Sequence, residues 1–142
     1  MRVVSIPIED SRPLRQAVLR PQEPLAAVAR MEPLEAVAYA AFEDGAERPI
    51  AVGLVGRDGE PGGWRVRGMA TEPEARGRGA GTAVLQALIE HARGQGATLV
   101  WCNARIGART LYERAGFRVV SDEFEIEGIG PHYRMELRRS GQ

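Results

Sequence analysis

Three side chains in the C-terminal half of this 142-residue chain could take part in acid–base or nucleophilic chemistry. Tyr112 carries a hydroxyl that can donate a hydrogen bond or a proton, and His132 is of a residue type that titrates near neutral pH. Cys102 ends the apolar run Leu99–Cys102, so we interpret it as a small buried hydrophobic residue rather than a nucleophile. With two histidines and one cysteine, the chain offers no cluster of metal ligands, and we expect no metal.

A glycine-rich stretch in the middle of the chain could hold an anion. It reads Arg76, Gly77, Arg78, Gly79, Ala80, Gly81 and Thr82. Glycine lets the backbone approach a ligand closely, and the first N–H groups of a helix have no partner inside that helix. The helix dipole adds roughly half a positive charge at the same end. We therefore interpret the stretch as a cradle for a pyrophosphate, with its two arginines as further positive charge.

The elements around this cradle predict a parallel strand–helix–strand unit. Trp64–Ala70 has the composition of a strand, and Ala83–Ala92 places its apolar residues on one helical stripe. Thr98–Cys102 is almost wholly apolar, which is typical of a strand that is buried on both faces. We therefore predict a βαβ unit with a right-handed crossover, in which the cradle follows the first strand.

The remaining segments complete a mixed sheet. Further strands are expected at Arg2–Ile6, Ala36–Phe42, Pro49–Val55, Phe117–Val120, Asp122–Glu127 and His132–Arg138. A helix begins near Asp10 or Ser11, Leu25–Met31 is expected to be a loop with one helical turn, and Gly107–Ala115 is a short helix. The predicted fold is α/β, with a mixed sheet of about six or seven strands and flanking helices, in a single domain of residues 1–142.

The composition and the glycine spacing exclude two common classes of phosphate loop. A P-loop needs a lysine, and every basic residue of this chain is an arginine. A dinucleotide-binding loop needs the spacing G-x-G-x-x-G and an acid about twenty residues further on. Gly77–Gly81 has a different spacing, and no acid lies between Glu90 and Glu113.

The arrangement Arg76-x-x-Gly79-x-Gly81 is similar to the R/Q-x-x-G-x-G/A signature of the GNAT acetyltransferase superfamily. Ala108–Phe117 resembles the A-x-x-x-Y-x-x-x-G-F helix and strand start of the same superfamily, and the order and spacing hold throughout Trp64–Phe117. The resemblance implies an enzyme that transfers an acetyl group from acetyl-CoA to a primary amine of a small molecule or peptide. Transfer is implied to occur by direct attack in a ternary complex.

The resemblance also implies roles for individual residues. In this family acetyl-CoA binds between two parallel strands that splay apart, which here implies contacts with Met69, Ala70, Thr71, Arg76, Gly77, Arg78, Gly79, Ala80, Gly81, Thr82 and Asn103. Tyr112 matches the tyrosine that protonates the departing thiolate in many members. Many members carry a glutamate base on the strand before the loop, but Trp64–Ala70 has no acid. His132 is our named candidate for the base, with Glu32, Glu125, Glu127 and a relay through water as alternatives.

Several points stay open in the sequence. A non-catalytic acyl-CoA-binding or regulatory domain on the same fold is the alternative function, which the missing strand acid favours and Tyr112 opposes. The acceptor pocket is expected to be formed by residues 10–45 and by the loop before His132.

Zero net charge argues against nucleic acid as a partner. The short apolar runs and the single cysteine indicate a cytoplasmic protein without a membrane segment. Whether the chain forms a homodimer is open.

Overall fold

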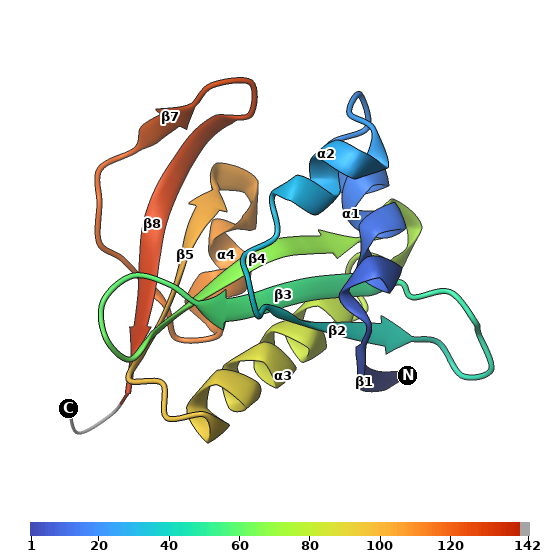
Figure 1. Cartoon of the computed structure of the whole chain (residues 1–142), viewed down its shortest axis with the longest axis horizontal. Coiled ribbons are helices and arrows are strands. Elements are labelled where there is room, and N and C mark those ends of the chain that lie inside the picture. The colour runs from blue at the N-terminus through green and yellow to red at the C-terminus, as the bar shows by residue number, and fades with distance from the viewer. Residues whose placement is uncertain (140–142) are drawn as a thin grey trace.

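An eight-stranded sheet runs through the computed structural model, which describes residues 1–139 (Figure 1). In chain order the elements are β1 (Arg2–Ile6), α1 (Arg12–Leu19), α2 (Leu25–Arg30), β2 (Val37–Phe42), β3 (Ala51–Arg57), β4 (Gly63–Thr71), α3 (Ala80–Gly94), β5 (Leu99–Arg105), α4 (Arg109–Arg114), β6 (Arg118–Val119), β7 (Phe124–Ile126) and β8 (Gly130–Arg138). The strand order is β1-β2-β3-β4-β5-β8-β6, and β7 pairs with β8. The mixed α/β fold predicted from the sequence is confirmed, with one strand more than the upper estimate.

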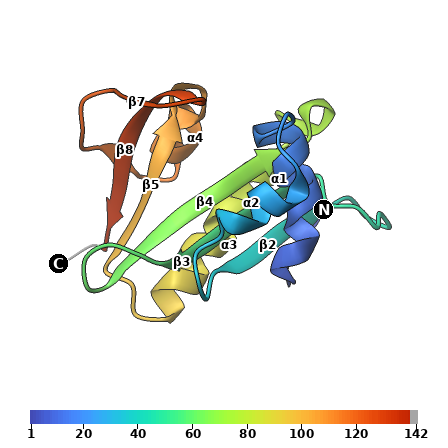
Figure 2. The same cartoon turned by 45° about the horizontal axis from the view of Figure 1, so that its top comes forward.

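The strand–helix–strand unit predicted around the glycine loop is present as β4, α3 and β5. These two strands form a parallel pair, whereas the other strand pairs are antiparallel. The buried stripe of α3 packs against β2, β3 and β4 on one face of the sheet. On the opposite face α1 packs against β4 and α2 packs against α1 (Figure 2). The helices therefore cover both faces and leave the edges of β4 and β5 to shape the site.

Strands β4 and β5 separate after a short paired stretch. They are hydrogen-bonded only where Gly63–Arg65 faces Leu99–Trp101, and Figure 1 shows the two strands diverging beyond it. The register between β3 and β4 shifts between Val52 and Leu54, where β4 bulges and Gly68 adopts a φ of +63°. A bulge bends its strand and increases the local twist, so it helps to turn β4 away from β5.

Gly53 on β3 permits this bulge. A Cβ atom at Gly53 would lie 2.4 Å from the sulfur of Met69 and 2.9 Å from a methyl of Leu88. A larger residue would therefore require the side chains of Met69 and Leu88 to move, so the close packing of β3 here favours glycine.

The N-terminal helices depart from expectation in two details. Leu25–Arg30 is a helix rather than a loop with one turn, and Val28 packs inward with 3% of its surface exposed. The segment is short and lies between prolines, so its helical state depends on tertiary contacts more than on its sequence pattern. Ser11 stands before α1 as expected, but its hydroxyl donates to the carbonyl oxygen of Ile8 instead of capping the helix.

No helix within residues 1–139 has both the length and the apolar character needed to cross a bilayer.

Candidate active site

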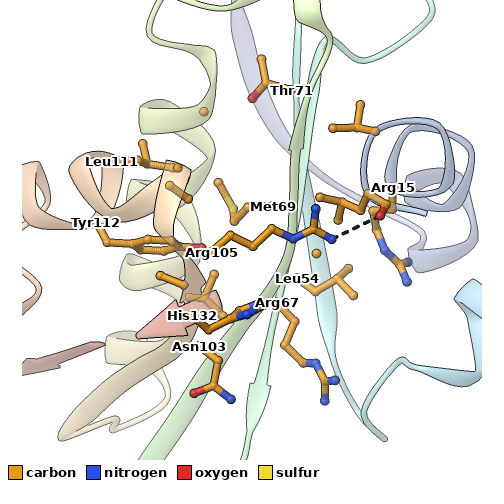
Figure 3. A pocket seen from close by; sticks show the side chains of 18 of the residues that line it. Arg15, Leu54, Arg67, Met69, Thr71, Asn103, Arg105, Leu111, Tyr112 and His132 are labelled. Atoms are coloured by element: carbon orange, nitrogen blue, oxygen red, sulfur yellow. Dashed lines mark hydrogen bonds between the residues drawn. The ribbon is translucent and has the colours of Figure 1, made fainter. Parts of the chain in front are cut away.

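A cavity of about 880 Å³ lies where β4 and β5 diverge. The cavity is lined by the glycine loop, which we call its cofactor end, and by residues of α1 and α2, which we call its acceptor end. Figure 3 shows Leu111 and Tyr112 reaching into it from the α4 side and Arg15 facing them from α1. The splay thus brings together the two regions that the sequence predicted for the cofactor and for the acceptor.

The glycine loop has a backbone suited to an anion. Gly77 and Gly79 both have a φ of +82°, a conformation that other residues adopt only with strain, and α3 begins directly after Gly79. Gly81 packs so closely on β4 that a Cβ would lie 3.1 Å from the hydroxyl of Thr71. Within residues 1–139, none of the backbone N–H groups of residues 77–82 donates a hydrogen bond. These donors, at the positive end of a helix dipole, fit a diphosphate.

The edge of β4 beyond the paired stretch fits an extended ligand. From Val66 to Thr71 the side of β4 that faces β5 has no partner strand among the described residues. Met69–Thr71 lies in this stretch, and Met69 and Thr71 line the cavity. Asn103, half-buried on β5, lines it from the opposite side. An amide-containing arm could hydrogen-bond along such an edge as an added strand does.

The two arginines of the loop lie in different surroundings. Arg76 is exposed and lines the cavity. Arg78 forms an ion pair with Glu43 and also donates to the carbonyl oxygen of Glu74, at 3.3 Å. The side chain of Arg78 therefore points to the β2–β3 connection, and its charge is partly neutralised before any ligand binds.

Tyr112 is held rigidly beside the cavity. It is 5% exposed and its ring meets Phe117 edge-on, with 5.3 Å between the centroids. Burial raises the pKa of Tyr112 well above its ordinary value, and neighbouring Cys102 raises it further. The hydroxyl consequently stays protonated across the physiological range and can act as a hydrogen-bond donor.

Cys102 is buried, as its apolar surroundings in the sequence indicated. Only 1% of its surface is exposed, and burial raises the pKa of its thiol to about 12. Because the thiolate is the nucleophilic form, this cysteine is inert at neutral pH.

His132 is also buried, with 4% of its surface exposed, and it lines the cavity. Its Nδ1 lies 2.8 Å from the carbonyl oxygen of Gly130. A carbonyl oxygen only accepts hydrogen bonds, so Nδ1 carries the proton, and in the neutral ring Nε2 is left with a free lone pair. The ring of Phe124 stacks on His132 with 6.0 Å between centroids, which fixes the plane of the imidazole.

The other acids considered as bases lie outside the cavity wall. Glu32 is wrong for this role, because its carboxylate accepts hydrogen bonds from Arg12 at 2.8 Å and from Arg15 at 2.7 Å. The hydrogen bond from Arg12, and next the one from Arg15, lowers the pKa of Glu32, so the carboxylate is a poor proton acceptor. Glu125 and Glu127 are exposed and do not line the cavity.

A set of arginines around the cavity was missed in the sequence. Besides Arg76, the cavity is lined by Arg15, Arg20, Arg65, Arg67, Arg105 and Arg114, and by no aspartate or glutamate among the described residues. Two signals were available, since Arg65 and Arg67 alternate on one face of a predicted strand and Arg105 follows Asn103 by two positions. Neither signal shows by itself that these side chains meet those of α1.

Comparisons with known proteins agree with this geometry. The model of the acetyltransferase (GNAT) family matches residues 7–117. YitI of Bacillus subtilis strain 168, described as an uncharacterized N-acetyltransferase, is 28% identical to this chain. The alignment has a length of 142 residues and covers 95% of this chain and 94% of that protein.

Two solved structures share the fold at low sequence identity. An aminoglycoside 6′-N-acetyltransferase complexed with coenzyme A is 14% identical, with a TM-score of 0.79 and 97% of each chain covered. The ribosomal-protein-S18-alanine N-acetyltransferase of Escherichia coli is 17% identical, with a TM-score of 0.75 over 96% of this chain and 92% of that one. With the family match over most of its length, the chain belongs to the GNAT family of acetyltransferases, enzymes that use acetyl-CoA.

Proposed function

We propose that this enzyme, acting as a single domain, acetylates a primary amine by direct attack in a complex that holds both substrates. The observation that carries the proposal is that one cavity is lined by Tyr112, by the unpaired part of β4 and by the glycine loop, whose N–H groups at residues 77–82 have no partner among the described residues. When bound, acetyl-CoA supplies an acetyl thioester, whose carbon–sulfur bond breaks as the acceptor nitrogen forms the new carbon–nitrogen bond.

The cofactor-binding residues would act mainly through their backbone. The proposed pyrophosphate ligands are the N–H groups of Gly77, Arg78, Gly79, Ala80, Gly81 and Thr82. Arg76, exposed at the cavity, would add charge, whereas Arg78 would add less because Glu43 already pairs with it. Met69–Thr71 and Asn103 would hydrogen-bond the pantetheine arm, which positions the thioester near Tyr112.

Tyr112 would donate a hydrogen bond to the departing sulfur. Its raised pKa keeps the proton on the oxygen, and its burial places the donor in a site with little competing water. Charge that develops on the sulfur is stabilised more strongly there than in bulk solvent.

His132 would accept the proton that the acceptor ammonium must lose, directly or through one water. The free Nε2 lone pair and the cavity-lining position of the ring support this role. Of the four side chains considered as the base, His132 is the one that lines the cavity. Glu32, in contrast, is paired with Arg15.

Replacement of Tyr112 by phenylalanine tests the proposal. We expect kcat for thiol release to fall about 100-fold, because the hydrogen-bond donor to the departing sulfur is removed. The affinity for acetyl-CoA, measured by calorimetry, should stay within about threefold. Tyr133→Phe is the matched control, since Tyr133 is half-buried on β8 and does not line the cavity. An unchanged kcat in Tyr112→Phe contradicts the assigned role. No thiol release with any amine would favour the binding-only alternative.

A further inference from the structure

The acceptor end of the cavity carries more positive charge than the surrounding side chains neutralise. Arg15, Arg20, Arg65, Arg67 and Arg105 line it, and no carboxylate from residues 1–139 does so. Figure 3 shows Arg67 and Arg105 at this end, together with Arg15 of α1. Such a concentration of like charge is unfavourable unless counter-charges or a ligand compensate for it.

Three of these arginines have acidic partners outside the cavity wall. Arg15 lies 2.7 Å from the carboxylate of Glu32. Arg20 lies 3.3 Å from Glu23, and Arg65 lies 3.7 Å from Asp58. These pairs stabilise the fold around the cavity and leave little charge for a ligand.

Arg67 and Arg105 are different. Neither forms an ion pair with any residue in the described part of the chain. Arg105 extends from β5 across the cavity to α1, where its Nη2 donates to the carbonyl oxygen of Leu19 at 3.2 Å (Figure 3). The guanidinium of Arg67 makes no hydrogen bond to another described residue. Burial, and next the charges of nearby arginines, lower the pKa of both guanidinium groups. Both nevertheless stay charged, because arginine does not lose its proton in proteins.

This charge lies apart from the proposed pyrophosphate position. Thr71 contacts the start of α3 through Gly81, and Arg67 precedes it by four residues along β4. Four residues of an extended strand span roughly 13 Å, and the bulge lies between the two positions. Arg76 lies in the glycine loop itself and lines the cavity, so a pyrophosphate held there does not need Arg67 as its counter-ion.

We propose that Arg67 and Arg105 bind an oxyanion of the acceptor, so that the acceptor is a small molecule with both a primary amine and a carboxylate or phosphate. Guanidinium groups match the geometry of either oxyanion. The inference rests on the proposed acetyl transfer and names its substrate class. It also disfavours a polycationic acceptor such as an aminoglycoside, which would face this cluster without a carboxylate in the cavity wall.

Matched pairs of acceptors test the substrate class. Thiol release is measured for L-amino acids against their carboxamides, and for phosphoethanolamine against ethanolamine. The amides hold more neutral amine at neutral pH, so a preference for the carboxylate must come from binding. We expect the anionic member of the preferred pair to show at least tenfold higher kcat/KM, and the responding pair distinguishes carboxylate from phosphate. Equal or better turnover of the uncharged member, or of spermidine, overturns the proposal.

The variant Arg67→Gln tests the named residue. It should raise KM for the anionic acceptor about tenfold and leave KM for its uncharged partner unchanged. Because Arg67 makes no hydrogen bond to any residue that the structure describes, the variant should melt as the wild type does. Arg93→Gln removes the same charge from the exposed end of α3 and should behave as the wild type. An equal effect of Arg67→Gln on both members of the pair overturns the assignment.

A binding experiment decides the matter if no acceptor in the panel is turned over. Inorganic phosphate is titrated by calorimetry into the enzyme saturated with coenzyme A, which fills the pyrophosphate position. Wild type and Arg93→Gln should bind phosphate, and Arg67→Gln should bind it at least tenfold more weakly. Absence of phosphate binding, or equal binding to all three proteins, overturns the inference. Failure of the proposed function would appear separately, as binding of coenzyme A without thiol release for any amine.

Discussion

The two ends of the cavity supply positive charge in different ways. At the cofactor end the donors are backbone N–H groups at the start of α3, with Arg76 as an exposed addition. At the acceptor end the donors are the guanidinium groups of Arg67 on β4 and Arg105 on β5. A backbone cradle depends on glycine at particular positions, whereas a side-chain cluster depends on which elements the fold places side by side. In our proposal the first binds the pyrophosphate of acetyl-CoA, and the second binds an oxyanion of the acceptor.

Within the acceptor end, Arg15 and Arg67 show a second contrast. Arg15 is 4% exposed and bonds Glu32, the hydroxyl of Ser11 and the carbonyl oxygen of Val28. It therefore ties α1 to α2 and forms part of the wall. Arg67 is half-buried and has no such partners among residues 1–139. Two arginines that line the same cavity thus have separable contributions, one to stability and one to binding.

We expect the largest effect for Glu32→Gln, which tests whether residues that hold the cavity wall together can be distinguished from residues that bind a ligand. This change leaves buried Arg15 without its counter-ion, and the free energy of unfolding should fall by roughly 3 kcal/mol. The affinity for acetyl-CoA should change little, because Glu32 does not line the cavity. Urea denaturation and calorimetry measure the two quantities. Glu90→Gln is the control, because it removes an exposed acid of α3 that forms no ion pair among residues 1–139.

The same ion pair predicts a pH dependence of stability. The pKa of Glu32 is lower in the folded protein than in the unfolded chain, because Arg12 and next Arg15 donate to its carboxylate. Its contribution is therefore present above about pH 4.5 and is lost as the pH falls through the folded pKa. Glu32→Gln should remove this part of the acid sensitivity. A variant as stable as the wild type, with the same pH profile, would contradict the structural role of the pair.

The smallest effect is expected at Cys102, which is buried on β5 and does not line the cavity. With a thiol pKa of about 12, this residue cannot carry the acetyl group at neutral pH. Cys102→Ala should keep kcat within about threefold and lower the free energy of unfolding by about 1 kcal/mol. Thiol-release kinetics and thermal melting measure these changes. An acetylated Cys102 in the intact-mass spectrum, or loss of turnover in the variant, would replace direct attack by a covalent route.

The contrast between the ends also explains what the sequence could predict. The βαβ unit, the glycine loop and the position of Tyr112 follow from local patterns, since each depends on residues within a few turns or strands of one another. The helical state of Leu25–Arg30 does not, because contacts with Arg15 and the packing of Val28 maintain it. Tertiary structure overrode the local signal there.

The acceptor end was the least predictable part. Arg105 and the carbonyl oxygen of Leu19 are far apart in the chain but hydrogen-bonded in the fold. Glu32 has the right residue type for a base, but its two arginine partners come from an earlier helix. A single sequence shows residue types, whereas the role of a charged side chain depends on the charges that the fold places around it.

Calorimetric titration of acetyl-CoA into wild type, Gly79→Val and Arg67→Gln tests most directly whether the cradle and the arginine cluster bind different ligands. Gly79 precedes α3 at a φ of +82°, which a β-branched residue cannot adopt without strain, so valine should reorient the N–H groups of the loop. We predict one-to-one binding to wild type and Arg67→Gln with equal affinity. Binding to Gly79→Val should be about 100-fold weaker, with a melting transition that shows the variant to be folded. Undiminished binding to Gly79→Val, or equal weakening in Arg67→Gln, would contradict the account.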